Sequence, residues 1–505
     1  MTPRLSDAML AGLSDFLVRE MGLLFPRERW SDLEKGVVAA AREFGFAEVD
    51  DCIEWLLSAH LTRRQVETLA GYLTVGETYF FRDPRSFELL EREVLPGILR
   101  SRRGKDQRLR IWSAGCSTGE EAYSIAILLH RLLPDLDKWK VTILASDINP
   151  AALRKGMAGV YGKWSFRGAP SWLRTLYFKP EAEGRFQVAD LIRPMVSFEY
   201  LNLAQDSYPS LYSNTNAMDI IMCRNVLMYF APETARSVVA KLHRSLVPGG
   251  WLIAGPAELS RVGGEPLEPV NFEGATLFRK QEPHFEEPVE STLQVSGMEP
   301  EKSDQPRPRS PREAAESLYR QGRHAEAAAL LMALYPADGM PTDVMTLLIR
   351  CHANRGELSL ALELCGAALA REKLDPALHF IRAEILQEQG RDGEALTSLN
   401  HALYLDPKLV LAHFALGNIS LWSGRPEKAH KHFENALALL ERSGPDEILP
   451  YSEGMTAGRL REIILFTNMP HTGGEGTRRG DCSFAPAFPM KGPLKVREDR
   501  KSEEP

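Results

Sequence analysis

Four glycines in the last third of the chain recur every 34 residues, at Gly322, Gly356, Gly390 and Gly424. An alanine follows each glycine five residues later, at Ala327, Ala361, Ala395 and Ala429. Glycine can end a helix in the left-handed conformation, and alanine lets two helix backbones approach closely. The period therefore predicts stacked helical hairpins, which form a surface suited to holding partners.

This period is typical of tetratricopeptide repeats, and four repeats exceed the roughly three needed for stability. The alternative is a helical bundle with accidental spacing. We expect the concave face of the repeats to bind an unidentified peptide or helix of a signalling partner, or to pack on the rest of the chain as a regulator. Histidines are frequent here, but the closest pair, His430 and His432, does not share a helix face. No metal site is expected.

Composition narrows the class of protein. The 505 residues suggest about three domains, and a net charge of -7 gives no electrostatic reason to expect nucleic acid. Six cysteines without a CxxC motif fit a reducing compartment. We find neither a secretory signal at the start nor an apolar run long enough to span a bilayer. We expect a cytoplasmic protein that reaches membranes only through a partner.

From Arg108 onward, short apolar runs alternate with helical patterns, which indicates a doubly wound α/β sheet. The sequence GRFQVADLIRPMVSFEY interrupts this alternation and suggests short inserted antiparallel strands. We divide the chain into a helical N-terminal domain (1–90), an α/β domain (91–280) with a β insertion near 160–200, a disordered linker (281–312), the repeats (313–445) and a mostly disordered tail (446–505).

The first strand-to-helix turn, Ser113–Glu121, is where an open α/β sheet binds its ligand. Glu120 and Glu121 begin the following helix, where a dinucleotide would place its pyrophosphate. Two like charges at ~4 Å cost about 1–4 kcal/mol, so a cationic cofactor such as S-adenosylmethionine suits the turn better. The alternative is that both glutamates only complement the helix dipole.

Polar residues also end the later strands. Asp147 follows the second strand, where a carboxylate can accept hydrogen bonds from both ribose hydroxyls. Asn202 follows a third strand-like run, and Arg224 and Asn225 end a fourth, with Tyr229 close behind. An asparagine at such a position often only caps the next turn, so each residue alone leaves both interpretations open.

Five segments together resemble the CheR family of chemoreceptor glutamate methyltransferases: VGETYFFRD (75–83), WSAGCSTGEEAYSIA (112–126), ASDIN (145–149), LNL (201–203) and CRNVLMYF (223–230). The resemblance covers about residues 1–280. It implies a helical domain followed by an S-adenosylmethionine-dependent α/β domain with a small β insertion. It also implies that the substrate is a glutamate on the cytoplasmic helices of a chemoreceptor.

Carried over by position, the resemblance assigns cofactor contacts to Thr78, Arg82, Glu121, Asp147, Asn202, Leu203, Arg224 and Asn225. Arg82 and Tyr229 would also face the site of methyl transfer. Three segments depart from the family pattern. Gly76 stands where asparagine is usual, Ala122 where proline is frequent, and Gly255–Glu258 where a Gly-His-Ser-Glu-like sequence is usual.

The implied reaction needs little from the protein beyond positioning. A glutamate with a pKa near 4.3 is already ionised at about pH 7, so no general base is required. Arg82 can clamp the carboxylate, although pairing with Asp83 or Glu77 is an equal alternative. The basic run Gly97–Arg110 can steer an acidic helix or serve only as a solvated connector.

Two rival functions remain at this stage. One is a methyltransferase acting on a small molecule, which a lidded apolar pocket in the insertion would favour. The other is a non-catalytic adaptor in which the repeats carry the function and the α/β domain only senses cofactor. Gly76 and the altered Gly255–Glu258 segment are the features that favour the adaptor.

Overall fold

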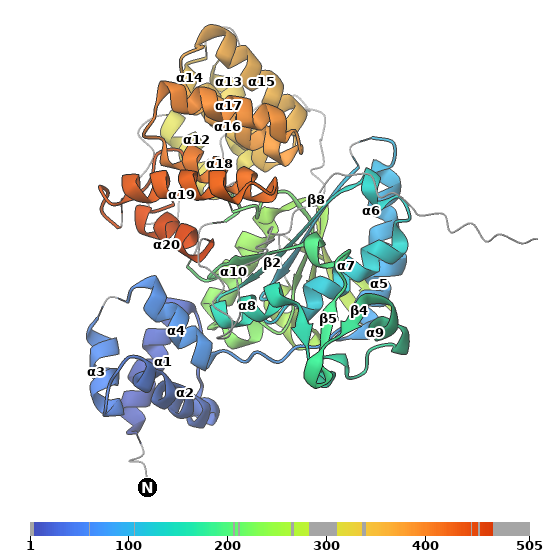
Figure 1. Cartoon of the computed structure of the whole chain (residues 1–505), viewed down its shortest axis with the longest axis vertical. Coiled ribbons are helices and arrows are strands. Elements are labelled where there is room, and N and C mark those ends of the chain that lie inside the picture. Colours follow the sequence, from blue (N-terminus) through green and yellow to red (C-terminus); the bar gives the residue numbers. More distant parts are fainter. Residues whose placement is uncertain are drawn as a thin grey trace, which may run out of the picture.

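The structure is a computed structural model of the whole chain. It describes residues 5–59, 61–105, 107–205, 208–210, 213–263, 267–281, 311–335, 340–445, 447–452 and 455–467. An N-terminal helical bundle and the C-terminal helical repeats lie at opposite ends of a central α/β domain (Figure 1). None of the described helices is long and apolar enough to cross a membrane. The expected linker and tail fall mostly outside the described residues.

The N-terminal bundle consists of α1 (Asp7–Met21), α2 (Trp30–Glu43), α3 (Val49–Ser58) and α4 (Arg63–Leu73). Their apolar faces meet in a core of their own that includes Leu13, Leu17 and Leu33. The bundle ends earlier than the expected residue 90. After it, the irregular segment 74–83 leads to α5 (Pro84–Leu89), η2 (Leu90–Val94) and α6 (Leu95–Arg102). These helices pack into the core of the α/β domain.

Seven strands form the central sheet in the order β6-β2-β1-β7-β8-β10-β9. The first five are parallel: β6 (Val196–Tyr200), β2 (Lys140–Asp147), β1 (Arg108–Ala114), β7 (Met218–Cys223) and β8 (Leu246–Ala254). The last two, β10 (Ala275–Lys280) and β9 (Leu267–Phe272), are antiparallel. The predicted doubly wound α/β class is confirmed.

Helices cover both faces of this sheet, because alternate residues of each buried strand are apolar on both sides. Ile111 and Ile143 face α7 (Glu120–Leu132) in one core cluster. Trp112 and Leu144 belong to the opposite cluster, together with residues of α10 (Pro232–Ser245). The two layers leave the carboxyl ends of β1, β2 and β7 meeting at one edge of the sheet.

The insertion holds a three-stranded antiparallel sheet, β3-β5-β4, together with α9 (Ser171–Tyr177). Its strands are β3 (Val160–Tyr161), β4 (Phe178–Pro180) and β5 (Phe186–Val188). The expected antiparallel strands are therefore present, but Val196–Tyr200 is not one of them. It pairs in parallel with β2 as an edge of the main sheet, from Ile143 opposite Val196 to Asp147 opposite Tyr200.

The repeats are pairs of antiparallel helices, as the 34-residue period predicts. They comprise α12 (Pro311–Arg320), α13 (His324–Leu334), α14 (Thr342–Asn354), α15 (Leu358–Arg371), α16 (Pro376–Glu388), α17 (Asp392–Leu405), α18 (Val410–Trp422) and α19 (Pro426–Leu440). All four periodic glycines have φ between 68° and 79°, and the four alanines five residues later are at most 1% exposed. Within the stretch expected to be mostly disordered, α20 (Ala457–Thr467) packs against the last repeat.

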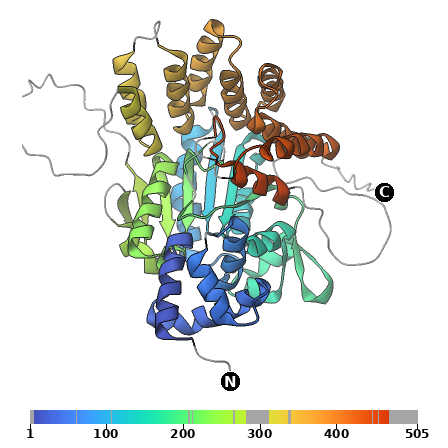
Figure 2. The same cartoon turned by 90° about the vertical axis from the view of Figure 1, so that its left-hand side faces the viewer.

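The repeats dock on the α/β domain at the amino-terminal ends of its strands (Figures 1 and 2). Arg108, at the start of β1, donates to the carbonyl of Gly356 at 3.1 Å. Lys140, at the start of β2, donates to the carbonyl of Gln387 at 2.9 Å. Of the two arrangements expected for the repeats, the structure contains packing on the α/β domain.

Candidate active site

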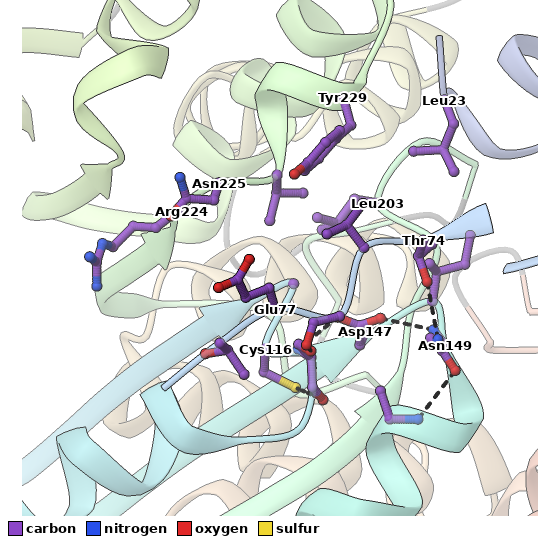
Figure 3. Close-up of a pocket in the computed structure, with 18 of the residues that line it drawn as sticks. Leu23, Thr74, Glu77, Cys116, Asp147, Asn149, Leu203, Arg224, Asn225 and Tyr229 are labelled. Atoms are coloured by element: carbon purple, nitrogen blue, oxygen red, sulfur yellow. Dashed lines mark hydrogen bonds between the residues drawn. The ribbon is translucent and has the colours of Figure 1, made fainter. Parts of the chain in front are cut away.

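One cavity lies at the carboxyl ends of β1, β2 and β7, closed on one side by the N-terminal bundle (Figure 3). Its empty volume is about 1150 Å³, which includes space open to solvent. All nine site residues expected from the sequence line it: Thr78, Arg82, Glu121, Asp147, Asn202, Leu203, Arg224, Asn225 and Tyr229. They come from segments up to about 150 residues apart in the chain, so the fold brings the complete set together.

The turn between β1 and α7 forms the floor of the cavity. Gly115 has a φ of 80°, and a Cβ there would lie 2.3 Å from Val226. Glycine is therefore required both for the backbone conformation and for the close approach of the Asn225–Val226 loop. Gly76 faces this turn, and the Ser117 hydroxyl donates to its carbonyl at 3.2 Å. A Cβ at Gly76 would meet only that hydroxyl oxygen, at 3.6 Å, so the departure from asparagine leaves open space.

Asp147 lies at the tip of β2 with its carboxylate fixed by backbone groups. Its oxygens accept from the N–H groups of Ser117 at 2.8 Å and Asn149 at 2.9 Å. Burial raises the pKa of this carboxyl above its ordinary value. Each oxygen keeps acceptor capacity, because a carboxylate offers about four lone-pair sites. Asn149 itself caps α8 (Pro150–Ala158), where its side-chain oxygen accepts from the N–H groups of Ala151 and Ala152.

The two adjacent glutamates at the start of α7 diverge. Glu121 turns toward the cavity, where the Ser113 hydroxyl donates to one oxygen at 2.7 Å and Arg224 to the other at 3.1 Å. Glu120 turns toward the insertion and accepts from Thr118 and Ser165. Burial raises the pKa of both carboxyls. Of the two glutamates, Glu121 lines the cavity and Glu120 does not.

Arg224 is placed to support Glu121 and segment 74–83. Its side chain is 2% exposed and donates to Glu121 and to the backbone carbonyl of Arg82, the latter at 2.7 Å. It also pairs with Asp83 at 3.4 Å. Its buried Nε has no partner among the described residues. Asp83 was one of the two carboxylates expected to pair with Arg82, but in the structure it pairs with Arg224.

Arg82 and Tyr229 both line the cavity. Arg82 donates through Nη1 to the backbone carbonyl of Glu77 at 2.8 Å, and it pairs with neither candidate carboxylate in the described part of the chain. The ring of Tyr229 lies under the guanidinium of Arg29, 5.1 Å from its centroid. In Figure 3 the Tyr229 hydroxyl points into the cavity. Arg29 comes from the N-terminal bundle and was not expected from the sequence.

Asn202 joins the cavity wall to the N-terminal bundle. Its amide donates to the carbonyl of Glu20 at the end of α1, at 3.1 Å, and its oxygen accepts from the N–H of Ala204. Leu24 donates to the carbonyl of Tyr229 at 2.8 Å, which fixes the bundle a second time. The bundle therefore forms one wall of the site, and no local pattern in the sequence predicted this.

Glu258 is a second residue that the sequence reasoning missed. It is fully buried, and its two carboxylate oxygens accept from the N–H groups of Gly255, Asn225, Val226 and Met228 at 2.7–3.1 Å. It thereby holds the loop that carries Arg224, Asn225 and Tyr229. The acidic residue one turn after the last parallel strand was visible in the sequence, but three of its four partners lie about 30 residues away.

No group of three or more His, Cys, Asp or Glu side chains in the described ranges is placed to hold a metal ion. The cavity instead offers three carboxylates, those of Glu77, Glu121 and Asp147, and free space next to a glycine turn. These groups fit a cofactor that carries positive charge and ribose hydroxyls.

Comparison with known proteins agrees with this geometry. The family model "CheR methyltransferase, SAM binding domain" matches residues 76–267. Chemotaxis protein methyltransferase 2 of Vibrio cholerae is 38% identical over 199 residues, covering 39% of this chain and 67% of that protein. The probable biofilm formation methyltransferase WspC of Pseudomonas aeruginosa is 30% identical over 375 residues, covering 70% of this chain and 81% of that protein.

Among solved structures, MamA from Desulfovibrio magneticus RS-1 superposes on 26% of this chain and 74% of that one, with a TM-score of 0.24 and 16% identity. That likeness is too slight to carry an argument. The fold and the site define an S-adenosylmethionine-dependent methyltransferase. The chain belongs to the CheR methyltransferase family.

Proposed function

We propose that this protein transfers the methyl group of S-adenosylmethionine to glutamate side chains on the cytoplasmic helices of chemoreceptors, forming methyl esters. The observation that carries the proposal is that Arg82 and Tyr229 line the same cavity as Asp147 and Glu121. A binding site for a methyl donor and two groups able to hold a carboxylate therefore share one space. The names of the chemotaxis relatives support the receptor as substrate.

We assign Asp147 and Glu121 to the cationic and ribose parts of the cofactor. Asp147 can accept from ribose hydroxyls, because a carboxylate offers about four lone-pair sites and its backbone partners do not fill them all. Glu121 supplies negative charge beside the cavity. Its ion pair with Arg224 offsets the free-energy cost of burying the Glu121 carboxylate. Thr78, Asn202, Leu203 and Asn225 line the remaining walls.

S-adenosylmethionine supplies a methyl group on a cationic sulfur, and its transfer to a carboxylate oxygen leaves a neutral thioether. A glutamate is already ionised near neutral pH, so no proton has to move. The residues of this chain then have the task of positioning. The Arg82 guanidinium can hold the carboxylate through two N–H groups, and the Tyr229 hydroxyl can donate one more hydrogen bond. Correct placement of the reacting groups can supply about 7–11 kcal/mol of the barrier.

The match to the biofilm-formation methyltransferase is longer than the catalytic part of this chain, because its 70% coverage exceeds residues 5–281. The match to that relative therefore extends into the repeats of this chain. We propose that the repeats bind a protein of the same signalling pathway, which would set where in the cytoplasm methylation takes place. The repeats dock away from the cavity, so such a partner need not cover the site.

Replacing Arg82 tests the proposal. Wild-type protein, labelled S-adenosylmethionine and receptor fragments of the same organism should give base-labile methyl groups on the receptor. For Arg82→Ala we expect kcat to fall by about 100-fold, because the carboxylate loses its alignment. Arg236→Ala is the matched control, since Arg236 is 73% exposed on α10. Unchanged incorporation by Arg82→Ala would overturn the assignment of Arg82.

A further inference from the structure

Arg167, in the insertion, makes an unusual set of contacts with the segment that carries Arg82. Its guanidinium carbon lies 4.0 Å from the ring centroid of Tyr79 and 4.5 Å from that of Trp164. Nη2 donates to the Glu77 carboxylate at 2.7 Å, and Nη1 donates to the carbonyl of Trp164 at 3.0 Å. The Arg167 side chain is only 22% exposed, whereas that of Glu77 is 62% exposed.

Segment 74–83 has no regular secondary structure, yet it brings Thr78 and Arg82 to the cavity. Its second half is fixed by burial: Phe80 packs against Phe166 and Phe178, and its N–H donates to the carbonyl of Ser165 at 2.9 Å. Its first half lies on the surface, where Val75 is 52% exposed. The first half therefore depends on specific contacts.

A chain of contacts connects Arg167 to Arg82. Arg82 donates to the backbone carbonyl of Glu77, and the side chain of the same Glu77 accepts from Arg167. Tyr79 lies between Glu77 and Arg82 in sequence. The Arg167 guanidinium stacks on its ring, and the guanidinium carbon of Arg82 lies 5.8 Å from the ring centroid. Fixing Glu77 and Tyr79 thus fixes the carbonyl that orients the Arg82 guanidinium.

We propose that Arg167 is a positioning residue for methyl transfer: it holds Glu77 and Tyr79 so that Arg82 faces the cavity in its working orientation. This inference rests on the proposed function of Arg82. The insertion then helps to position Arg82, because it fixes the exposed part of a segment that Ser117 and Arg224 of the sheet domain also contact. The contact requires a planar group between two rings, which arginine provides and lysine does not.

The first experiment measures hydrogen exchange of the backbone amides of residues 76–82 in full-length protein. Arg167→Ala and Arg167→Lys should both exchange faster there than wild type, with the lysine variant intermediate because it keeps only the charge. Arg185→Ala is the matched control. Arg185 lies in the same insertion, is 53% exposed and pairs with Glu183, outside the segment. Exchange equal to wild type in both Arg167 variants would overturn the proposal.

The second experiment separates positioning from general stability by kinetics. We expect Arg167→Ala to lower kcat by about 10- to 100-fold, with a smaller change in affinity for S-adenosylhomocysteine. In an Arg82→Ala background the same change should cost little more, because Arg167 acts through Arg82. Fully additive losses would contradict the proposal.

These two experiments also distinguish this inference from the proposed function. If receptor glutamates are not methylated by the wild-type protein, the proposed function fails. The exchange measurement would still decide whether Arg167 holds the segment.

Discussion

At the scale of single residues, the site depends on a carboxylate that faces no ligand. Glu258 accepts four backbone hydrogen bonds from two loops and is fully buried. Asn225, one of its donors, has a φ of 57°, a conformation that non-glycine residues seldom adopt. The hydrogen bonds to Glu258 compensate for this conformation, and they keep Tyr229 at the cavity wall.

Glu258→Gln should therefore weaken the site, although glutamine has nearly the same size and shape as glutamate. One oxygen becomes an NH2 group, which faces N–H donors and leaves them without an acceptor. We expect the free energy of unfolding to fall by about 1–3 kcal/mol. Affinity for S-adenosylhomocysteine and kcat should fall with it, measured by calorimetry and by methyl transfer. Glu268→Gln, on the exposed face of β9, is the control. A Glu258→Gln protein that matches wild type in both stability and affinity would contradict this role.

At the scale of elements, the chain shows which predictions depend on local signals. The helix ends at the turn glycines and the alternation of strands and helices could be predicted from the sequence, because both follow from local backbone preferences. Val196–Tyr200 was counted both in the inserted antiparallel strands and as a third strand end, because its parallel pairing with β2 depends on residues distant in sequence. The basic run 97–110 was likewise ambiguous. In the structure Arg102 pairs with the buried Asp219 and Arg103 pairs with Asp135, so these charges are satisfied within the molecule.

The repeat glycines allow a matched comparison between two turns of the same type. Gly322 and Gly424 both have positive φ, 74° and 68°, so alanine at either costs about 1–2 kcal/mol of backbone strain. A Cβ at Gly322 would also lie 2.1 Å from Cδ of Arg244 in the α/β domain, whereas nothing lies within 4 Å at Gly424. Gly322→Ala should loosen the dock, and Gly424→Ala should not. Small-angle scattering of the full chain measures this as a larger radius of gyration; equal radii would refute it.

At the scale of the whole molecule, buried charge joins the repeats to the catalytic domain. Arg110 of β1 pairs with Glu388 of α16 at 2.5 Å, and their side chains are only 3% and 9% exposed. Arg110 also donates to the carbonyl of Asn216. Burial lowers the pKa of Arg110, and Glu388 opposes that shift. This contact spans 278 residues of sequence, so no local pattern in either half could reveal it.

The same interface gives a dependence of stability on pH. Burial lowers the pKa of Lys140 from 10.5 to about 8. Between about pH 8 and 10.5 the unfolded chain holds a proton at this amine that the folded chain has lost. The free energy of unfolding therefore rises with pH through that window. Burial of the charged Lys140 destabilises the folded protein fully below about pH 8, and this cost is removed by about pH 10.5.

Lys140→Met should flatten this dependence. We expect the difference in unfolding free energy between wild type and Lys140→Met to change with pH in the wild type's favour from pH 8 to 10.5. Lys138→Met, in the exposed turn before β2, should run parallel to wild type. Chemical unfolding at several pH values measures both. A Lys140→Met curve parallel to wild type would show that this amine keeps its ordinary pKa.

The most direct test of the account is to locate the transferred methyl group. Full-length protein is incubated with receptor fragments and S-adenosylmethionine deuterated in its methyl group, and the receptor peptides are then sequenced by mass spectrometry. The account predicts the label as an ester on glutamate side chains, lost on mild base treatment and greatly reduced with Arg82→Ala. Label on any other kind of residue, or no label from a protein that binds S-adenosylhomocysteine, would contradict it.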